Sequence, residues 1–139
     1  AVVIMAALAR HGDAPLSASS LAAELALPEP TVAKVLKILA KGALVHSVRG
    51  VNGGYSLAGT PAAIRVSAII EAMEGPIALT SCLQGSQDTC GLETVCQLRG
   101  RWNVVNTAIK TALDNVTLAD IMPPGRARVR VVAEKGARA

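Results

Sequence analysis

The sequence predicts a mainly α-helical fold with a small β-hairpin wing: a winged helix-turn-helix followed by a long C-terminal dimerisation helix. Three observations predict this fold. Two segments with helical apolar spacing meet at a proline-containing turn near residues 26–30, a glycine-rich hairpin signal covers residues 44–57, and an apolar stripe with heptad spacing begins at residue 98. Apolar residues three to four positions apart indicate helices, whereas a glycine-rich tip between two short β-prone runs indicates a hairpin.

Composition limits the class and the location of the protein. The 139 residues are 51% hydrophobic but include no Phe, one Trp and one Tyr, so the core must be aliphatic. No apolar run approaches the ~20 residues that span a bilayer, and the apolar start at residues 1–8 lacks the basic flank and cleavage site of a secretory signal. We therefore expect a cytoplasmic protein with no membrane partner. The first residue is not Met and lies in a helix-like stretch, so we also expect further residues upstream.

The net charge of +4 comes entirely from the C-terminal tail. Residues 125–139 contain five basic residues and one acidic residue, whereas residues 1–124 are neutral overall. This Gly-, Arg- and Ala-rich composition predicts a disordered tail that adds non-specific affinity for phosphates. DNA binding by the folded part must therefore be inferred from where its charges lie.

The first three predicted helices are short and have recognisable ends. Residues 1–11 are helical in character, up to Gly12. Ser17 is the predicted N-cap of a second helix over residues 18–25, with Leu16 and Leu21 placed as a hydrophobic staple. A turn with Pro30 then starts a third helix over residues 29–41, because proline is tolerated in a first helical turn.

The third helix has one apolar face and one basic face. Four apolar residues at helical spacing form the face predicted to be buried: Val32, Val35, Leu36 and Leu39. Thr31, Lys34 and Lys37 lie outside that face and are predicted to contact DNA, as residues of a recognition helix do. The alternative is that the lysines only solvate a surface helix.

A hairpin follows directly after this helix. Residues 44–48 and 55–57 are strand-like, and residues 49–54 between them are rich in residue types that accept the positive φ angles of a tight tip. A hairpin at this place is typical of a wing, from which Ser47, Arg49 and Asn52 can contact phosphates or a narrow minor groove. A winged helix that binds a partner protein stays an alternative.

The C-terminal half is predicted to contain two longer helices. One covers residues 66–74, and the other covers residues 95–115, followed by a last helical turn at residues 117–121. Apolar residues recur along the second with alternating spacings of four and three: Leu98, Trp102, Val105, Ile109, Ala112 and Val116. Such heptad spacing favours pairing with a second copy of the helix, with packing on its own domain as the alternative. We expect a homodimer.

The chain has three cysteines, all in the segment between these two helices. Cys82, Cys90 and Cys96 are spaced C-x7-C-x5-C. An odd number of thiols cannot all pair within one chain, and clustered thiolates favour soft metal centres such as iron–sulfur clusters, zinc or copper(I). Two alternatives to an iron–sulfur cluster stay open: a zinc site with one further ligand, and a metal-free thiol switch.

With these features, the sequence resembles the Rrf2 family of bacterial transcription regulators. The resemblance runs in order over residues 1–122 and is carried by the wing at residues 47–55, the helix end at residues 71–76, Trp102 and residues 116–120. It is strongest to the three-cysteine members that sense iron–sulfur status, oxidants or nitric oxide, above all the regulators of iron–sulfur cluster assembly operons. It implies a dimeric repressor of such genes, whose cysteines hold a cluster, [2Fe–2S] in preference to [4Fe–4S].

The sequence departs from that family pattern in the cysteine segment and in the third helix. Cys82 and Cys90 are separated by seven residues, where the regulators of cluster assembly have a shorter gap. Arg99 stands where some members have a histidine, and a guanidinium has no lone pair to offer a metal. Asp88 and Glu93 are the acidic candidates for a fourth ligand within the segment, and some relatives take a carboxylate from the N-terminal segment of the partner subunit. In the third helix, Ala33 and Lys34 replace acidic and amide residues, so base preference cannot be transferred.

We therefore expect four regions: a winged helix-turn-helix at residues 1–76, a cysteine segment at residues 77–97, a dimerisation helix at residues 98–122 and a basic tail at residues 123–139. The expected partners are double-stranded promoter DNA and a second copy of the chain, with no small-molecule substrate. An enzyme is not expected, because His11 and His46 are far apart in the sequence and no phosphate-binding loop or nucleophile motif occurs.

Overall fold

A computed structural model describes residues 1–81, 83, 90–92 and 94–123 of the chain. The elements within these residues are α1 (Val2–His11), α2 (Ala18–Leu25), α3 (Glu29–Lys41), β1 (Val45–Val48), β2 (Gly54–Leu57), α4 (Val66–Glu74), α5 (Asn103–Asp114) and α6 (Leu118–Ile121). Helices α2, α3 and α4 begin and end where the sequence predicts, and the predicted hairpin and last turn are present. None of the described helices is long and apolar enough to cross a membrane. The predicted basic tail lies outside the described residues.

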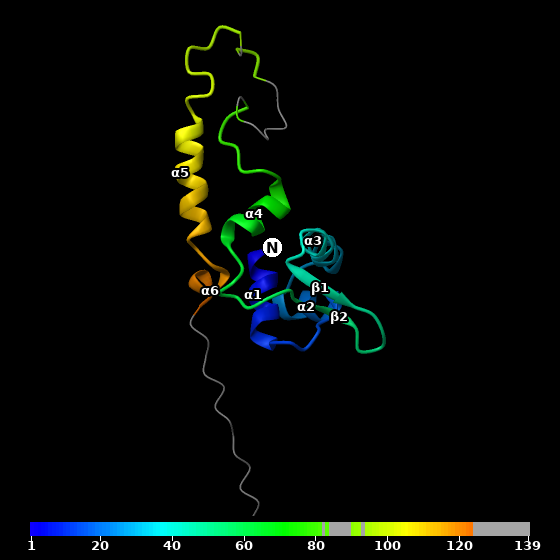
Figure 1. Cartoon of the computed structure of the whole chain (residues 1–139). Coiled ribbons are helices and arrows are strands. Elements are labelled where there is room, and N and C mark those ends of the chain that lie inside the picture. The colour runs from blue at the N-terminus through cyan, green and yellow to red at the C-terminus, as the bar shows by residue number, and fades with distance from the viewer. Residues whose placement is uncertain (82, 84–89, 93, 124–139) are drawn as a thin grey trace, which may run out of the picture.

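The core of the helical head is aliphatic, as the composition predicts. Helix α1 buries five consecutive residues, and α3 buries one stripe of three residues whose exposed fraction is zero: Val32, Leu36 and Leu39. Leu118 of α6 is also completely buried in this core, although it lies far along the chain. The chain therefore returns to the head after α5, which fixes the C-terminal end of that helix to the head (Figure 1).

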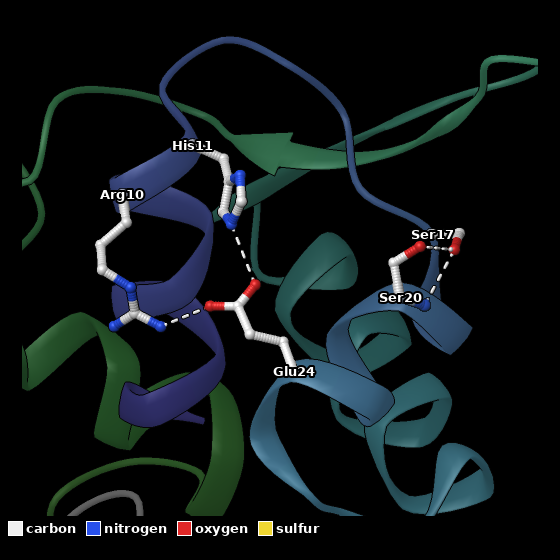
Figure 2. A network of polar contacts seen from close by, with 5 residues as sticks. All are labelled: Arg10, His11, Ser17, Ser20 and Glu24. Atoms are coloured by element: carbon white, nitrogen blue, oxygen red, sulfur yellow. Dashed lines mark hydrogen bonds and ion pairs between the residues drawn. The ribbon is translucent and has the colours of Figure 1, made fainter. Parts of the chain in front are cut away.

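The start of α2 confirms the predicted N-cap. The hydroxyl of Ser17 accepts a hydrogen bond from the backbone N–H of Ser20 at 3.0 Å, so one of the free donors of the first helical turn is satisfied. Near the other end of α2, Glu24 reaches back to α1, where its carboxylate lies 2.7 Å from the Arg10 guanidinium and 2.9 Å from Nε2 of His11 (Figure 2). These contacts join the end of α1 to the end of α2.

The stability that the Glu24 carboxylate contributes to the contact between α1 and α2 depends on pH. The hydrogen bond from Arg10, and a smaller one with His11, lower the pKa of Glu24 below its usual value. A carboxylate whose pKa falls on folding stabilises the fold fully above its unfolded pKa, and this contribution disappears as the pH falls through the folded pKa. We expect Glu24→Gln to cost about 0.5 kcal/mol at pH 7, as for an exposed pair, and almost nothing near pH 3.

Urea unfolding of the two proteins across this pH range checks the expectation. Glu74→Gln is the matched control, because Glu74 is an exposed carboxylate at the end of α4. A cost of Glu24→Gln that stays constant from pH 7 to pH 3 would contradict an electrostatic role for this contact.

The hairpin is anchored to the loop that precedes α2. Strands β1 and β2 pair antiparallel, with Val45 opposite Leu57 and Val48 opposite Gly54. Leu16 adds a further bridge. Its backbone N–H donates to the carbonyl of Tyr55 at 2.9 Å, and its backbone carbonyl accepts from the Tyr55 N–H at 2.8 Å. A Cβ atom on Gly54 would lie 2.5 Å from the Leu16 carbonyl, so only glycine allows this close approach.

The long C-terminal helix is shorter than predicted, and this part of the prediction was wrong. Helix α5 begins at Asn103 instead of Val95, and residues 94–102 form a series of turns. Gly100 has a φ of 73°, which is a left-handed conformation that ends helical geometry. Leu98 therefore lies in a turn and Trp102 lies at the N-cap of α5.

Helix α5 lies beside α4 (Figure 1), and polar side chains join the two helices. Lys110 donates to the Glu71 carboxylate at 2.6 Å, and this hydrogen bond raises the pKa of Lys110. Asp114 accepts from the hydroxyl of Ser67, and Asn106 contacts the backbone just beyond the end of α4. Asn106, Lys110 and Asp114 are spaced four residues apart, so they form one stripe of the helix, which we call the polar row.

Candidate nucleic-acid interface and cysteine segment

The predicted recognition face of α3 points to solvent. Thr31, Lys34 and Lys37 are all exposed, while the opposite stripe of the helix is completely buried. Within the described residues, neither Lys34 nor Lys37 forms an ion pair with an acidic side chain. Both ammonium groups are therefore available for an external anion such as a DNA phosphate.

The wing extends this basic surface beyond the helix. Ser47, Arg49 and Asn52 are exposed, on β1 and on the tip of the hairpin. Val51 at the tip is fully exposed, so the tip projects without packing on the head. Figure 1 shows α3 and the hairpin on one side of the head and α5 on the other. An exposed helix beside an exposed hairpin is the arrangement that allows simultaneous contact with a groove and with the flanking phosphates.

The apolar stripe predicted for dimerisation is largely uncovered in the single chain. Leu98, Trp102, Val105 and Ile109 have exposed fractions of 55%, 40%, 42% and 38%. Ala112 is exposed and Val116 is half-buried. Leu98, Trp102 and Val105, together with Arg101, line a shallow apolar hollow of about 230 Å³.

Two of the three predicted metal ligands lie within the described residues. Cys90 is half-buried and Cys96 is exposed, and both are free thiols. Cys82 lies outside the described residues, as do the acidic candidates Asp88 and Glu93. Within the part that the structure describes, no group of three or more His, Cys, Asp or Glu side chains is placed to hold a metal ion.

The polar row is the feature of this region that the sequence reasoning missed. Its four-residue spacing is present in the sequence, but four-residue spacing of polar residues is common on exposed helix faces. Its partners on α4, Ser67 and Glu71, have the same spacing. Matching polar spacings on two helices joined by a long segment are a signal, although a weak one, of a helix pair.

Comparisons with known proteins agree with this architecture. The Rrf2 family, described as iron-dependent transcriptional regulators, matches residues 1–124. CymR of Bacillus subtilis is 34% identical over 121 residues, which cover 86% of this chain and 82% of that protein. NsrR of Halalkalibacterium halodurans is 34% identical over 89 residues, covering 64% of this chain and 61% of NsrR.

Solved structures show the same similarity. The structure of CymR, the global cysteine regulator of B. subtilis, has a TM-score of 0.64 at 33% identity and covers 86% of this chain and 88% of its own. T. potens IscR has a TM-score of 0.58 at 33% identity, with 89% and 87% covered. Both the fold prediction and the prediction that the chain is not an enzyme are confirmed, because these relatives are regulators with a winged-helix fold. The chain belongs to the Rrf2 family of DNA-binding transcription regulators.

Proposed function

We propose that this protein is a cytoplasmic, homodimeric repressor that binds promoter DNA through α3 and the wing, and whose affinity is set by the state of its three cysteines. Its target genes are those of iron–sulfur cluster assembly. The observation that carries the DNA-binding part is the uncovered basic surface of α3 beside the exposed hairpin. The sensing part is supported by the cysteine spacing and by the family's description as iron-dependent.

On the DNA, the first half of α3 lies in the major groove. Thr31 and Lys34 are one turn apart and exposed, so they reach base edges or phosphates from the same side of the helix. Arg49 at the wing contacts the neighbouring backbone or minor groove. A second head, related by two-fold symmetry, binds the other half-site about one helical turn away.

DNA binding is tested by replacing the basic residues of α3 and of the wing. We expect Lys34→Ala and Arg49→Ala each to weaken operator binding about tenfold, and each to reduce the slope of log affinity against log salt by about 1. Fluorescence anisotropy at several salt concentrations measures both quantities. Lys41→Ala is the matched control, because Lys41 is an exposed lysine at the far end of the same helix. Unchanged affinity in both variants, with the protein folded, would show that the surface binds something other than DNA.

The dimer is supported by how α5 uses its faces. Its polar row faces its own head, through Lys110 and Glu71 among others, whereas the apolar stripe stays exposed. At 100° per residue the two stripes lie about 120° apart around the helix. The head therefore does not cover the apolar stripe, and we assign this stripe to the second copy, whose own stripe is the apolar surface that matches it.

The cysteine segment fits an iron–sulfur cluster by the chemistry of its donors. Cys90 and Cys96 are free thiols with access to solvent, and thiolate is the ligand that such clusters prefer. Cys82, Cys90 and Cys96 would hold the cluster, [2Fe–2S] in preference to [4Fe–4S], and the cluster would supply a centre that oxidants and iron shortage remove. The Arg99 guanidinium cannot complete the ligand set.

A cluster-free sensor is the second candidate. The exposure of the Cys96 thiol favours it, because an accessible thiol can be oxidised reversibly without any metal. The three thiols plus one further ligand also suit zinc. Metal and sulfide analysis of air-free protein separates the three cases: iron with acid-labile sulfide, zinc alone, or no metal with reversible disulfide formation.

A further inference from the structure

One side chain of α5, that of Asn106, fastens the start of the cysteine-bearing segment to that helix. The Asn106 amide N–H donates to the carbonyl of Ile77 at 2.9 Å, and its amide oxygen accepts from the N–H of Leu79 at 3.1 Å. We infer that Asn106 is the positioning residue through which a change in the cysteine segment reaches α4 and the recognition helix. This inference rests on the proposed function, because it concerns the regulation of the same sensor.

We call these two hydrogen bonds the Asn106 clasp, and residues 77–79 the neck of the cysteine segment. Ile77 and Leu79 precede Cys82, and Asn106 follows Cys96. All three cysteines therefore lie, along the chain, between the two parts that the clasp joins. The single amide of Asn106 forms both hydrogen bonds to the neck because it offers a donor and an acceptor together. Any rearrangement of the cysteine segment that shifts its neck must therefore either move α4 or break these two hydrogen bonds.

Helix α4 is the next part of the path. Only two residues separate Ile77 from Glu74, the last residue of α4, so the clasp acts directly on the end of that helix. In its last turns α4 packs closely on the end of α3, since a Cβ atom built on Gly42 would lie 2.9 Å from the Cβ of Ala72. Gly42 is the C-cap of α3. Two helices in such close contact cannot slide independently, so a shift of α4 changes the position of the recognition helix.

The other members of the polar row have a different role. Lys110 and Asp114 bind Glu71 and Ser67, which lie within α4 itself. They hold α5 against α4 whatever the cysteine segment does. Asn106 is the member of the row that holds backbone outside α4, on the side of the cysteines.

Hydrogen exchange of the full-length protein tests the inference. Residues 66–79 are followed before and after alkylation of the thiols with N-ethylmaleimide. In the wild-type protein we expect alkylation to speed exchange of these amides roughly tenfold, as expected when stabilising hydrogen bonds of the neck are lost. In Asn106→Leu, which has neither donor nor acceptor, exchange is expected to be fast already and indifferent to alkylation. Asn106→Asp keeps the acceptor for Leu79 and is expected to behave between the two.

Asn103→Ala is the control, because Asn103 is an exposed amide on the same helix. It is expected to respond to alkylation as the wild type does. Operator affinity is measured on the same samples, and alkylation is expected to change it in the wild type but not in Asn106→Leu. Equal responses of wild type and Asn106→Leu in hydrogen exchange, or no response in the wild type, would overturn the inference. A third outcome is that alkylation speeds hydrogen exchange only when the clasp is intact but leaves operator affinity unchanged. In that case the clasp does couple the cysteine segment to α4, and the proposed sensing function is wrong.

Discussion

Replacing Ile109 by aspartate is expected to turn the protein into a monomer and to lower its operator affinity by roughly 100-fold or more, because linked binding at two half-sites is lost. Ile109 is at the centre of the apolar stripe, with 38% of its surface exposed in the single chain. A carboxylate at this position would be buried without a partner in a dimer formed through the stripe. The substitution therefore destabilises the dimer, whereas in the monomer the carboxylate stays exposed to solvent.

The fold of each head should survive this change. Ile109 is not among the residues that build or cover the aliphatic core. The attachment of α5 to α4 runs through the polar row, whose Lys110–Glu71 and Asp114–Ser67 contacts do not involve Ile109. Circular dichroism of Ile109→Asp is accordingly expected to match the wild type.

Light scattering after size exclusion measures the mass, and anisotropy with a two-half-site operator measures the affinity. Thr107→Asp is the matched control, because it places the same charge on an exposed position of α5 about 180° from the centre of the stripe. This control is expected to stay dimeric and to bind normally. A dimeric Ile109→Asp with wild-type affinity would show that the two copies meet at another surface.

The elements that the sequence predicted correctly are those with local signals at both ends. Helix α2 begins at the Ser17 cap, and α3 begins at a proline turn and ends at Gly42, so hydrogen bonding within a few residues fixes their limits. The wing was predictable for the same reason, since its glycine-rich tip and β-prone flanks are consecutive in the sequence.

The start of α5 was not predictable from apolar spacing alone. The heptad pattern runs through Leu98 and Trp102 without a break. Apolar spacing alone does not include the free energy by which Gly100 would destabilise a helix at this point. In the structure Gly100 adopts a left-handed conformation, and the helix starts only after it. Tertiary packing does not offset that cost, because the side chains of this stretch are exposed.

The residues of the candidate site also differ in whether local sequence could predict them. Exposure of Lys34 and Arg49 followed from the position of the apolar residues around them, which is a local property. The Asn106 clasp joins Asn106 to Leu79 and Ile77, which lie 27 and 29 positions before it in the chain. Because the amide binds backbone atoms, the side chains of Ile77 and Leu79 carry no sign of this contact. Contacts of this kind depend on how α4 and α5 meet, which no local signal records.

Replacing Cys90 or Cys96 by serine is expected to abolish the response of operator binding to iron and oxygen. A serine hydroxyl is a hard, weakly acidic donor that cannot replace a thiolate on a soft metal. Protein prepared air-free with iron and sulfide should therefore hold about one cluster per chain as wild type and almost none as Cys96→Ser. Iron and sulfide analysis, together with the absorption of thiolate–iron bonds, checks this expectation.

Gln97→Ala is the matched control, because Gln97 is exposed directly beside Cys96 but carries no metal ligand of comparable softness. It should retain iron and the response to oxygen. Together with Cys82→Ser, these two variants make three single serine variants, which also separate the sensing mechanisms. A cluster or a zinc site needs all of its ligands, so each substitution should remove the metal, whereas a disulfide switch tolerates the loss of the thiol that is not part of the pair. If one of the three single serine variants keeps the full response to oxidants without bound metal, the sensor is a thiol pair. If all three keep it, the cysteines do not control DNA binding, although the DNA-binding surface around Lys34 and Arg49 would still stand.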